Sequence, residues 1–283
     1  MSPATRNAVA VMLHTVGLRR ARHRGLAGRS GVQRSSTWVG PPLNAAVSWV
    51  RAGDPAGHRV VLVHGTPGRA EGWSDYLLNP PPGVELVALD RPGFASSAPG
   101  GAKPELALQA AAVVAFLPGD GRRATLLGHS LGGAVVAQVA AQWPERVAGL
   151  ILLAAALDPA LERIHPLQPW AARRPWRGLL PSSLRHSNDE LLRFRAQLEA
   201  LVPQLHRIQA PTHVIHGARD HLVPYANVAY MQRMLRSVGK LRVETLDDGD
   251  HFLPWSAPAV VRGALTRAAA QVDATQPGPE GAA

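Results

Sequence analysis

The sequence contains no cysteine in its 283 residues. A disulfide, a thiolate nucleophile and a cysteine-ligated metal or iron–sulfur site are therefore excluded. Covalent catalysis by this chain would need an oxygen or nitrogen nucleophile. Long apolar runs are also missing, since stretches such as residues 149–157 are far shorter than the roughly 20 residues that span a bilayer. We expect no integral membrane association.

Lysine is scarce, because 28 of the thirty basic residues are arginine. The net charge of +10 is also unevenly distributed: residues 1–36 carry seven arginines and no acid, whereas residues 37–156 carry eight basic and eight acidic groups. A nucleic-acid-binding domain would concentrate positive charge on its folded face and interleave aromatic side chains. We therefore expect no nucleic-acid partner.

The basic N-terminal segment is expected to be an extension outside the fold. An apolar run at residues 8–18 precedes most of the arginines of this segment, and a secretory signal has the opposite order. One-sided charge over residues 1–36 favours a poorly ordered extension, with a targeting segment or a mis-assigned start codon as alternatives. We expect a cytoplasmic protein. Residues 273–283, rich in proline and glycine, are predicted to form a loose tail.

Short apolar runs alternate with helical patterns between these ends. This alternation predicts an α/β fold with a mostly parallel central sheet and helices on both faces. Residues 37–156 and 210–272 are assigned to this core. The expected strands are 46–50, 59–64, 84–89, 124–128, 149–154, 212–216 and 241–246.

Residues 157–209 interrupt the alternation with recurrent prolines, helical patterns and no convincing strand. A structureless loop of this length is uncommon in a compact domain, so a helical cap or lid above the sheet is the better interpretation. Trp170 and Trp176 lie in this insert beside several aliphatic residues. They are expected either to line a substrate pocket for a hydrophobic acyl group or to pack the insert against the core.

The strongest local motif is Gly-His-Ser-Leu-Gly-Gly at residues 128–133. It follows a predicted strand and precedes a predicted helix, which is the context that the G-x-S-x-G nucleophile elbow requires. The sharp turn leaves no room for a Cβ at the flanking glycines and presents Ser130 to the cleft. Ser130 is the predicted nucleophile.

A serine needs a base, and the base needs an orienting acid. Chain order for an elbow of this kind is serine, acid, histidine, which favours His251, in a glycine-containing loop after the last strand, as the base. Asp220, in a polar turn after the preceding strand, is the predicted acid, and Asp158 is the backup acid.

The loop His-Gly-Thr-Pro-Gly at residues 64–68 follows the first strongly apolar strand. The backbone amide of Thr66 is expected to point inward and to form an oxyanion hole with the amide of Leu131. A Gly-Pro turn alone is unspecific. Its position before a G-x-S-x-G motif makes the interpretation stronger.

Taken together, these motifs resemble those of the α/β-hydrolase-fold serine hydrolases with a helical cap, over roughly residues 40–272. The resemblance implies that the Asp90 loop supports the site without reacting. The matching segments are HGTPG at 64–68, DRPGFASS at 90–97, GHSLGG at 128–133, GARDHLVP at 217–224 and GDHF at 249–252.

The resemblance is less specific for substrate, because this fold hosts many chemistries. Dehalogenases and epoxide hydrolases of the fold use an aspartate where Ser130 stands, which favours hydrolysis of a small-molecule ester, thioester or lactone. A carbon–carbon bond hydrolase, a cofactor-free haloperoxidase and a non-catalytic binding protein on the same fold stay open. No cofactor and no metal are expected, since a serine triad needs neither, and the sequence indicates no particular oligomeric state.

Overall fold

The computed structural model describes Leu26 and residues 28–273. The predicted disorder of residues 1–25 and the predicted loose tail at residues 274–283 lie outside the described residues. An eight-stranded sheet has the order β1-β2-β4-β3-β5-β6-β7-β8. Its strands are β1 Val32–Val39, β2 Ala45–Gly53, β3 His58–Val63, β4 Val84–Leu89, β5 Ala124–His129, β6 Val147–Leu153, β7 Thr212–Gly217 and β8 Leu241–Leu246.

All seven expected strands are present, and those from β4 to β8 along the sheet pair in parallel. Strands β1 and β2 pair antiparallel at one edge. The predicted mostly parallel sheet is thereby confirmed. Its central strands are apolar on both sides because both of their faces are covered.

The edge strand β1 was not expected, and residues 32–36 were assigned to the extension. Most of its residues are exposed, so it carries no alternation of apolar and polar side chains that a sequence pattern could reveal. Backbone pairing with β2 holds it in place. Arg34 adds an anchor, because its guanidinium donates to the buried carboxylate of Asp90 at 2.8 Å.

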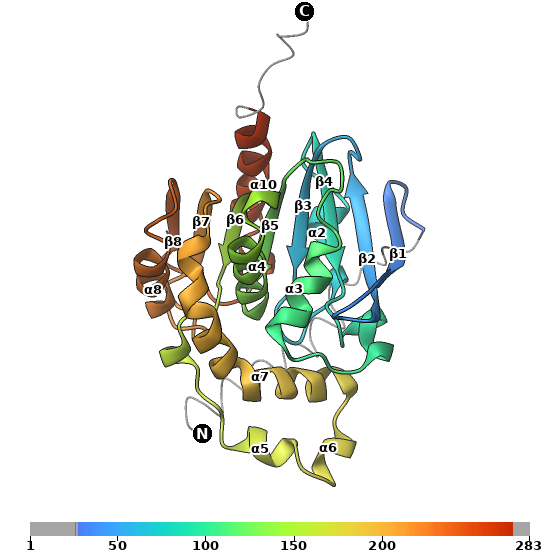
Figure 1. Ribbon diagram of the computed structural model, residues 1–283, viewed down its shortest axis with the longest axis vertical. Helices are drawn as coiled ribbons and strands as arrows, with labels where there is room; N and C mark the ends of the chain where they lie inside the picture. Colours follow the sequence, from blue (N-terminus) through green and yellow to red (C-terminus); the bar gives the residue numbers. More distant parts are fainter. Residues whose placement is uncertain (1–25, 27, 274–283) are drawn as a thin grey trace, which may run out of the picture.

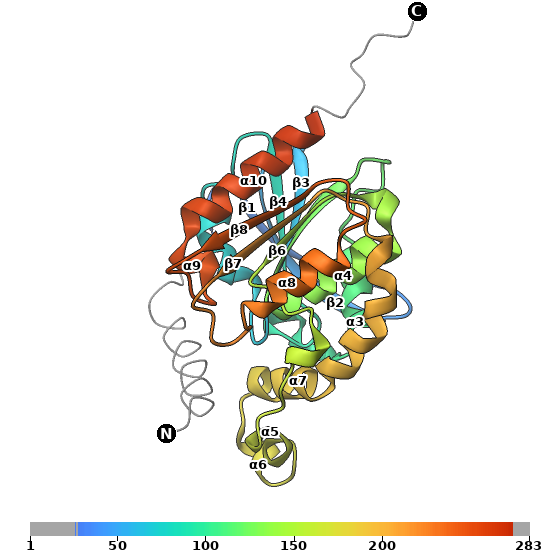
Figure 2. The same cartoon turned by 90° about the vertical axis from the view of Figure 1, so that its left-hand side faces the viewer.

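Helices cover both faces of the sheet and enclose two hydrophobic cores (Figures 1 and 2). One core lies under α3, α4 and α8, and the other under α2 and α10. Successive residues of β3 alternate between them, as the two-residue period of a strand requires: Val61 and Val63 join the first, Val60 and Leu62 the second. The helices are α2 Ser74–Leu77, α3 Leu106–Val114, α4 Leu131–Gln142, α8 Ala226–Met234, α9 Leu253–Ser256 and α10 Pro258–Asp273.

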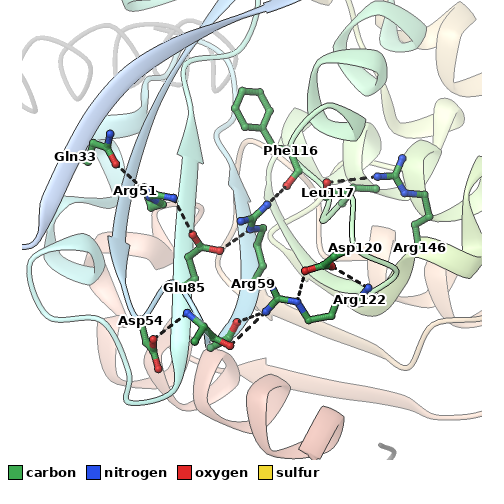
Figure 3. Close-up of polar contacts among 12 residues, drawn as sticks. Gln33, Arg51, Asp54, Arg59, Glu85, Phe116, Leu117, Asp120, Arg122 and Arg146 are labelled. Carbon is green, nitrogen blue, oxygen red and sulfur yellow. Dashed lines mark hydrogen bonds and ion pairs between the residues drawn. The ribbon is translucent and has the colours of Figure 1, made fainter.

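Polar contacts fasten the amino-terminal ends of β3 and β4 (Figure 3). The buried carboxylate of Glu85 accepts from Nε of Arg59 at 2.6 Å and lies 3.5 Å from the guanidinium of Arg51. Arg59 also donates to the Phe116 carbonyl at 3.2 Å. Since these contacts lie at the amino ends, the opposite end of the sheet is left for the residues that follow the strands.

The insert at residues 157–209 is helical and contains no strand. Figure 1 places its helices at one end of the sheet, with α5 and α6 farther from the strands than α7. Its elements are the 3₁₀ turns η4 Pro159–Leu161 and η5 Val202–Arg207 and the helices α5 Leu167–Ala171, α6 Trp176–Leu179 and α7 Ser182–Leu201. Within the described chain, no helix combines the length and hydropathy needed to cross a membrane.

Candidate active site

Ser130 occupies the turn between β5 and α4 in a strained conformation. Its φ of +56° and ψ of −127° lie in a region that residues with a side chain rarely adopt. The turn is held on both sides, because the Ser130 N–H donates to the Leu153 carbonyl at 3.0 Å and the Gly133 N–H donates to the Ser130 carbonyl at 2.8 Å. Backbone hydrogen bonds thus offset the strain at this position.

Two glycines make this turn possible through close approach of backbone segments. A Cβ on Gly128 would lie 2.3 Å from the Gly132 carbonyl oxygen, and one on Gly132 would lie 2.5 Å from the Val63 carbonyl oxygen. Both distances are shorter than any real Cβ contact. The motif spacing therefore follows from the need to pack β3, β5 and the start of α4 against one another.

The two amides predicted to form an oxyanion hole belong to Leu131 and Thr66. Leu131 is the first residue of α4, so its N–H has no acceptor within the helix. Thr66 follows β3 by three residues. Its hydroxyl is buried and has no hydrogen-bond partner among the described residues.

The structure places the predicted acid and base in contact. Oδ2 of Asp220 accepts a hydrogen bond from Nδ1 of His251 at 2.8 Å. Oδ1 of Asp220 accepts from the backbone N–H groups of Leu222 and Val223 at 2.9 and 2.8 Å. The carboxylate is thus fixed by the turn that follows β7 and aimed at the imidazole.

The pKa of Asp220 reflects two opposing effects. Burial by itself would raise the pKa of this carboxyl group, but hydrogen bonds from His216 and His251 outweigh the burial and lower the pKa below its ordinary value. Asp220 is therefore a carboxylate at neutral pH. A carboxylate in this position selects the His251 tautomer with its proton on Nδ1 and leaves Nε2 free to accept one.

His129 connects the elbow to the loop of His251. Its Nε2–H donates to the His251 carbonyl at 2.9 Å, and the two imidazole centroids are 4.9 Å apart. Burial, followed by the proximity of His251, lowers the pKa of His129 to about 3. His129 is thus a neutral donor that holds the His251 loop next to the turn at Ser130.

Asp158, the backup acid, has a different local role. Its carboxylate accepts from the Ala160 N–H at 2.9 Å and caps the η4 turn. Geometry therefore favours Asp220 over Asp158 as the partner of His251.

Asp90 and Arg91, in the loop after β4, hold the segment on either side of Thr66. Asp90 Oδ1 accepts from the Ala70 N–H at 2.8 Å. Arg91 donates from Nε to the His64 carbonyl at 2.9 Å and from its terminal nitrogens to the Gly65 carbonyl at 3.0 Å and to the Glu190 carboxylate. Glu190, a buried residue of the cap helix α7, thereby contacts the Arg91 guanidinium, which binds the carbonyls of the two residues preceding Thr66.

Trp170 and Trp176 are placed on the surface of the cap. They are 60% and 53% exposed, which is less burial than either an enclosed acyl pocket or packing against the core would give them. The expected pocket role of these residues stays a prediction. Their exposure instead marks the far end of the cap as an apolar surface.

Three supporting residues were not foreseen in these roles: His129, His216 and Glu190. His216 is buried, and its Nε2 lies 3.4 Å from Asp220 Oδ2 and 3.0 Å from the Val223 carbonyl oxygen. The position of His129 inside the elbow motif could have suggested a contact with the histidine loop. No local pattern distinguishes Glu190 from the other charged residues of its helix.

Comparison with known proteins places this geometry in context. A model of the "Alpha/beta hydrolase family" matches residues 60–264. A pimeloyl-[acyl-carrier protein] methyl ester esterase of Vibrio campbellii is 33% identical over 136 residues, which cover 48% of each chain. A poly(3-hydroxyalkanoate) depolymerase of Ectopseudomonas oleovorans is 27% identical over 243 residues, covering 75% of this chain and 84% of the depolymerase.

The match with the dihydrolipoyllysine-residue acetyltransferase component of an acetoin cleaving system of Pseudomonas putida is 35% identical over 159 residues. It covers 54% of this chain and 42% of that protein. The chain thus spans about half or less of the length of this acetyltransferase component and of the methyl ester esterase. A putative aryl esterase from Burkholderia cenocepacia has a TM-score of 0.65 at 21% identity, over 83% of this chain and 97% of that one. A membrane phospholipase A has a TM-score of 0.63 at 23% identity, covering 97% and 99%.

Proposed function

The chain belongs to the alpha/beta hydrolase family, and we propose that it cleaves a carboxylic ester, or a related thioester or lactone, through an acyl-enzyme on Ser130. The observation that carries the proposal is the buried hydrogen bond between Asp220 and His251. His129 links this pair to the elbow. The names of two similar proteins, a methyl ester esterase and a putative aryl esterase, support the choice of an ester.

In the proposed reaction, Nε2 of His251 takes the proton of the Ser130 hydroxyl as Oγ attacks the ester carbonyl carbon. The carbonyl π bond becomes a lone pair on an oxyanion, which the amides of Thr66 and Leu131 stabilise. Collapse of this intermediate breaks the bond to the alcohol, and His251 returns the proton to the leaving oxygen. Water then repeats the sequence at the acyl-enzyme, so that the acid is released and Ser130 regains its proton.

Asp220 is proposed to act without accepting a proton. It orients the imidazole and stabilises the imidazolium that forms in each half of the reaction. Its lowered pKa supports this role, because the carboxylate stays charged while His251 is transiently positive. His216 and the Val223 amide are proposed to keep that carboxylate in place.

The test is a burst of nitrophenol from a nitrophenyl ester with a short acyl chain. The unmodified chain and a Ser182→Ala control, which removes an exposed hydroxyl on the cap, should give a burst followed by turnover. Ser130→Ala should give no burst and lose several orders of magnitude in kcat. An unchanged rate in Ser130→Ala would reject the proposal.

A fluorophosphonate probe separates a hydrolase from a binding protein on the same fold. Folded protein should be labelled at Ser130, and labelling should be absent in Ser130→Ala. Thioesters, lactones and a vinylogous diketone in the same assay distinguish ester cleavage from carbon–carbon bond cleavage, because the same three groups can serve both. Failure to label the folded protein would favour the binding protein.

A further inference from the structure

Exposed apolar side chains are concentrated at the far end of the cap. Among the described residues, seven large hydrophobic side chains are exposed, and five of them belong to residues 163–179, which we name the cap tip. Such clustering is unusual, because exposed apolar residues are normally scattered singly. The five are Ile164 at 49%, Leu167 at 63%, Trp170 at 60%, Trp176 at 53% and Leu179 at 74% exposure.

The charge of the cap tip has one sign. Residues 163–179 contain four arginines and no acidic residue. Arg177 is paired with Asp189 of α7 at 2.6 and 2.8 Å. The other three, Arg163, Arg173 and Arg174, are exposed and form no ion pair within the described part of the chain.

The cap tip is held in place, so its exposure is a feature of the folded cap. The ion pair of Arg177 with Asp189 fastens α6 to α7, and the side chain of Asn188 on α7 donates to the Gln168 carbonyl of α5 at 2.9 Å. Figures 1 and 2 both show α5 and α6 at the outer end of the cap, on the side of α7 away from the sheet. A flat surface could therefore meet them without obstruction from the core.

Tryptophan and leucine side chains beside arginines suit one environment in particular. Tryptophan and leucine favour the boundary between headgroups and acyl chains, and arginine favours the phosphates of anionic lipids. A protein partner with an acidic rim could meet the charge. The shortness of α5 and α6, which have five and four residues, favours a deformable surface over a shaped one.

We propose that the cap tip docks this protein on the surface of an anionic lipid bilayer. Trp170, Trp176 and the neighbouring aliphatic side chains enter the headgroup boundary, and Arg163, Arg173 and Arg174 contact lipid phosphates. This docking is peripheral, because no described helix is long and apolar enough to span a bilayer. The inference goes beyond the proposed hydrolysis and does not depend on it.

The test is cosedimentation of the full chain with vesicles, made in the Ser130→Ala background so that hydrolysis cannot alter the lipid. One set of vesicles contains phosphatidylcholine and phosphatidylglycerol in equal amounts, and the other contains phosphatidylcholine alone. We expect binding to the anionic vesicles that weakens as salt is added. Trp170→Ser with Trp176→Ser should reduce the partition coefficient at least tenfold.

Arg173→Gln with Arg174→Gln should reduce binding to anionic vesicles by about fivefold per arginine and leave any binding to neutral vesicles unchanged. The matched control is Trp38→Ser, which removes a tryptophan that is 67% exposed on β1 at the opposite edge from β8. It should bind like the parent. The N-terminal arginines are present in every variant, so they do not contribute to the differences.

Three results would overturn the proposal. One is absence of vesicle binding, and another is an equal loss in Trp38→Ser and in the double tryptophan variant. The third is tryptophan emission that is already blue-shifted without vesicles and shifts red in the double tryptophan variant, since the cap tip would then be covered by a second copy or by another part of the chain. Sedimentation velocity distinguishes these two coverings.

Discussion

The guanidinium of Arg91 and the carboxylate of Glu190, 99 residues apart in the sequence, form a two-pronged contact of 2.6 and 3.0 Å. Both side chains are almost fully buried. Burial of an ion pair costs solvation that only good geometry and further hydrogen bonds offset, and Arg91 obtains those bonds from the carbonyls of His64 and Gly65. The pair therefore couples the position of cap helix α7 to the loop that carries Thr66.

Replacing Glu190 by glutamine should destabilise the protein and slow its reaction. The neutral amide leaves the Arg91 charge buried without a counter-ion, which typically costs about 3–5 kcal/mol of unfolding free energy. The matched control is Glu199→Gln, because Glu199 forms an exposed pair with Arg195, and its loss should cost about 0.5 kcal/mol or less. Urea unfolding measures the loss of unfolding free energy in both variants.

A double variant, Arg91→Met with Glu190→Met, separates stability from positioning. It should regain much of the stability, since a buried ion pair can often be replaced by apolar side chains. Its kcat should stay low, because the carbonyls of His64 and Gly65 have lost their donors. Full recovery of kcat would contradict a positioning role for Arg91.

Asp220→Asn should keep substrate binding and lower kcat by up to about 10⁴-fold, as the precedent of the serine-protease triad suggests. An asparagine amide at this position would donate to Nδ1 and favour the wrong imidazole tautomer. Asp158→Asn is the comparison, and it should have a small effect, because that carboxylate caps the η4 turn. A larger loss in Asp158→Asn would reassign the acid.

Thr66→Val tests whether the Thr66 hydroxyl takes part beside the Thr66 amide. The backbone amide is unaffected by this substitution, and the buried hydroxyl has no partner among the described residues. We expect kcat within a fewfold of the parent and stability unchanged or raised by about 1 kcal/mol. A loss of about 10²–10³ in kcat would show that the hydroxyl itself stabilises the oxyanion.

Stability should fall as the pH is lowered from about 6.5 toward 3. Burial and then His251 lower the pKa of His129 to about 3, so the unfolded chain binds a proton in this window and the folded chain does not. The free energy of unfolding then falls by up to about 1.4 kcal/mol per pH unit for this group. His64 contributes in the same direction, because burial, followed by the charge of Arg91, lowers its pKa.

The pH dependence is measured by urea unfolding of the parent and of His129→Gln, in which the slope above pH 4 should be shallower. His206→Gln, at an exposed position, is the control and should retain the parental slope. The lowered pKa of Asp220 affects stability in a lower pH range, since its contribution to stability is lost only below the ordinary aspartate pKa of about 4. Equal slopes in all three proteins would contradict a neutral buried His129.

Much of the sheet could be predicted because its central strands are contiguous apolar runs. Residues 84–89 match β4 in both bounds, and every side chain of β4 is buried. The edge strand β8 also has its expected bounds, 241–246, although its sequence LRVETL is not a contiguous apolar run. β1 could not be predicted, because an edge strand exposed over most of its length has no apolar face. Strand formation there depends on backbone pairing with β2, which leaves no mark on the composition of the strand.

Part of the candidate site could likewise be predicted from the sequence, and part could not. Gly128, Ser130 and Gly132 identify the elbow from the sequence alone, because the steric demand that requires them arises between segments that the motif itself positions. The contact of Asp220 with His251 could be expected from chain order, since both follow neighbouring parallel strands. Its distance, and the second histidine beside the carboxylate, depend on how β7 and its turn pack.

Only the tertiary structure decided which polar groups are buried together and which apolar groups are left outside. In the sequence, nothing marks Arg91 and Glu190 as residues to be buried, yet both are buried. Trp170 and Trp176 were expected in a pocket or in the packing of the insert, yet both are exposed. Short-range periodicity determines the elements that a segment forms. Burial is determined by which surfaces meet after folding, and here α7 covers Arg91 while nothing among the described residues covers the cap tip.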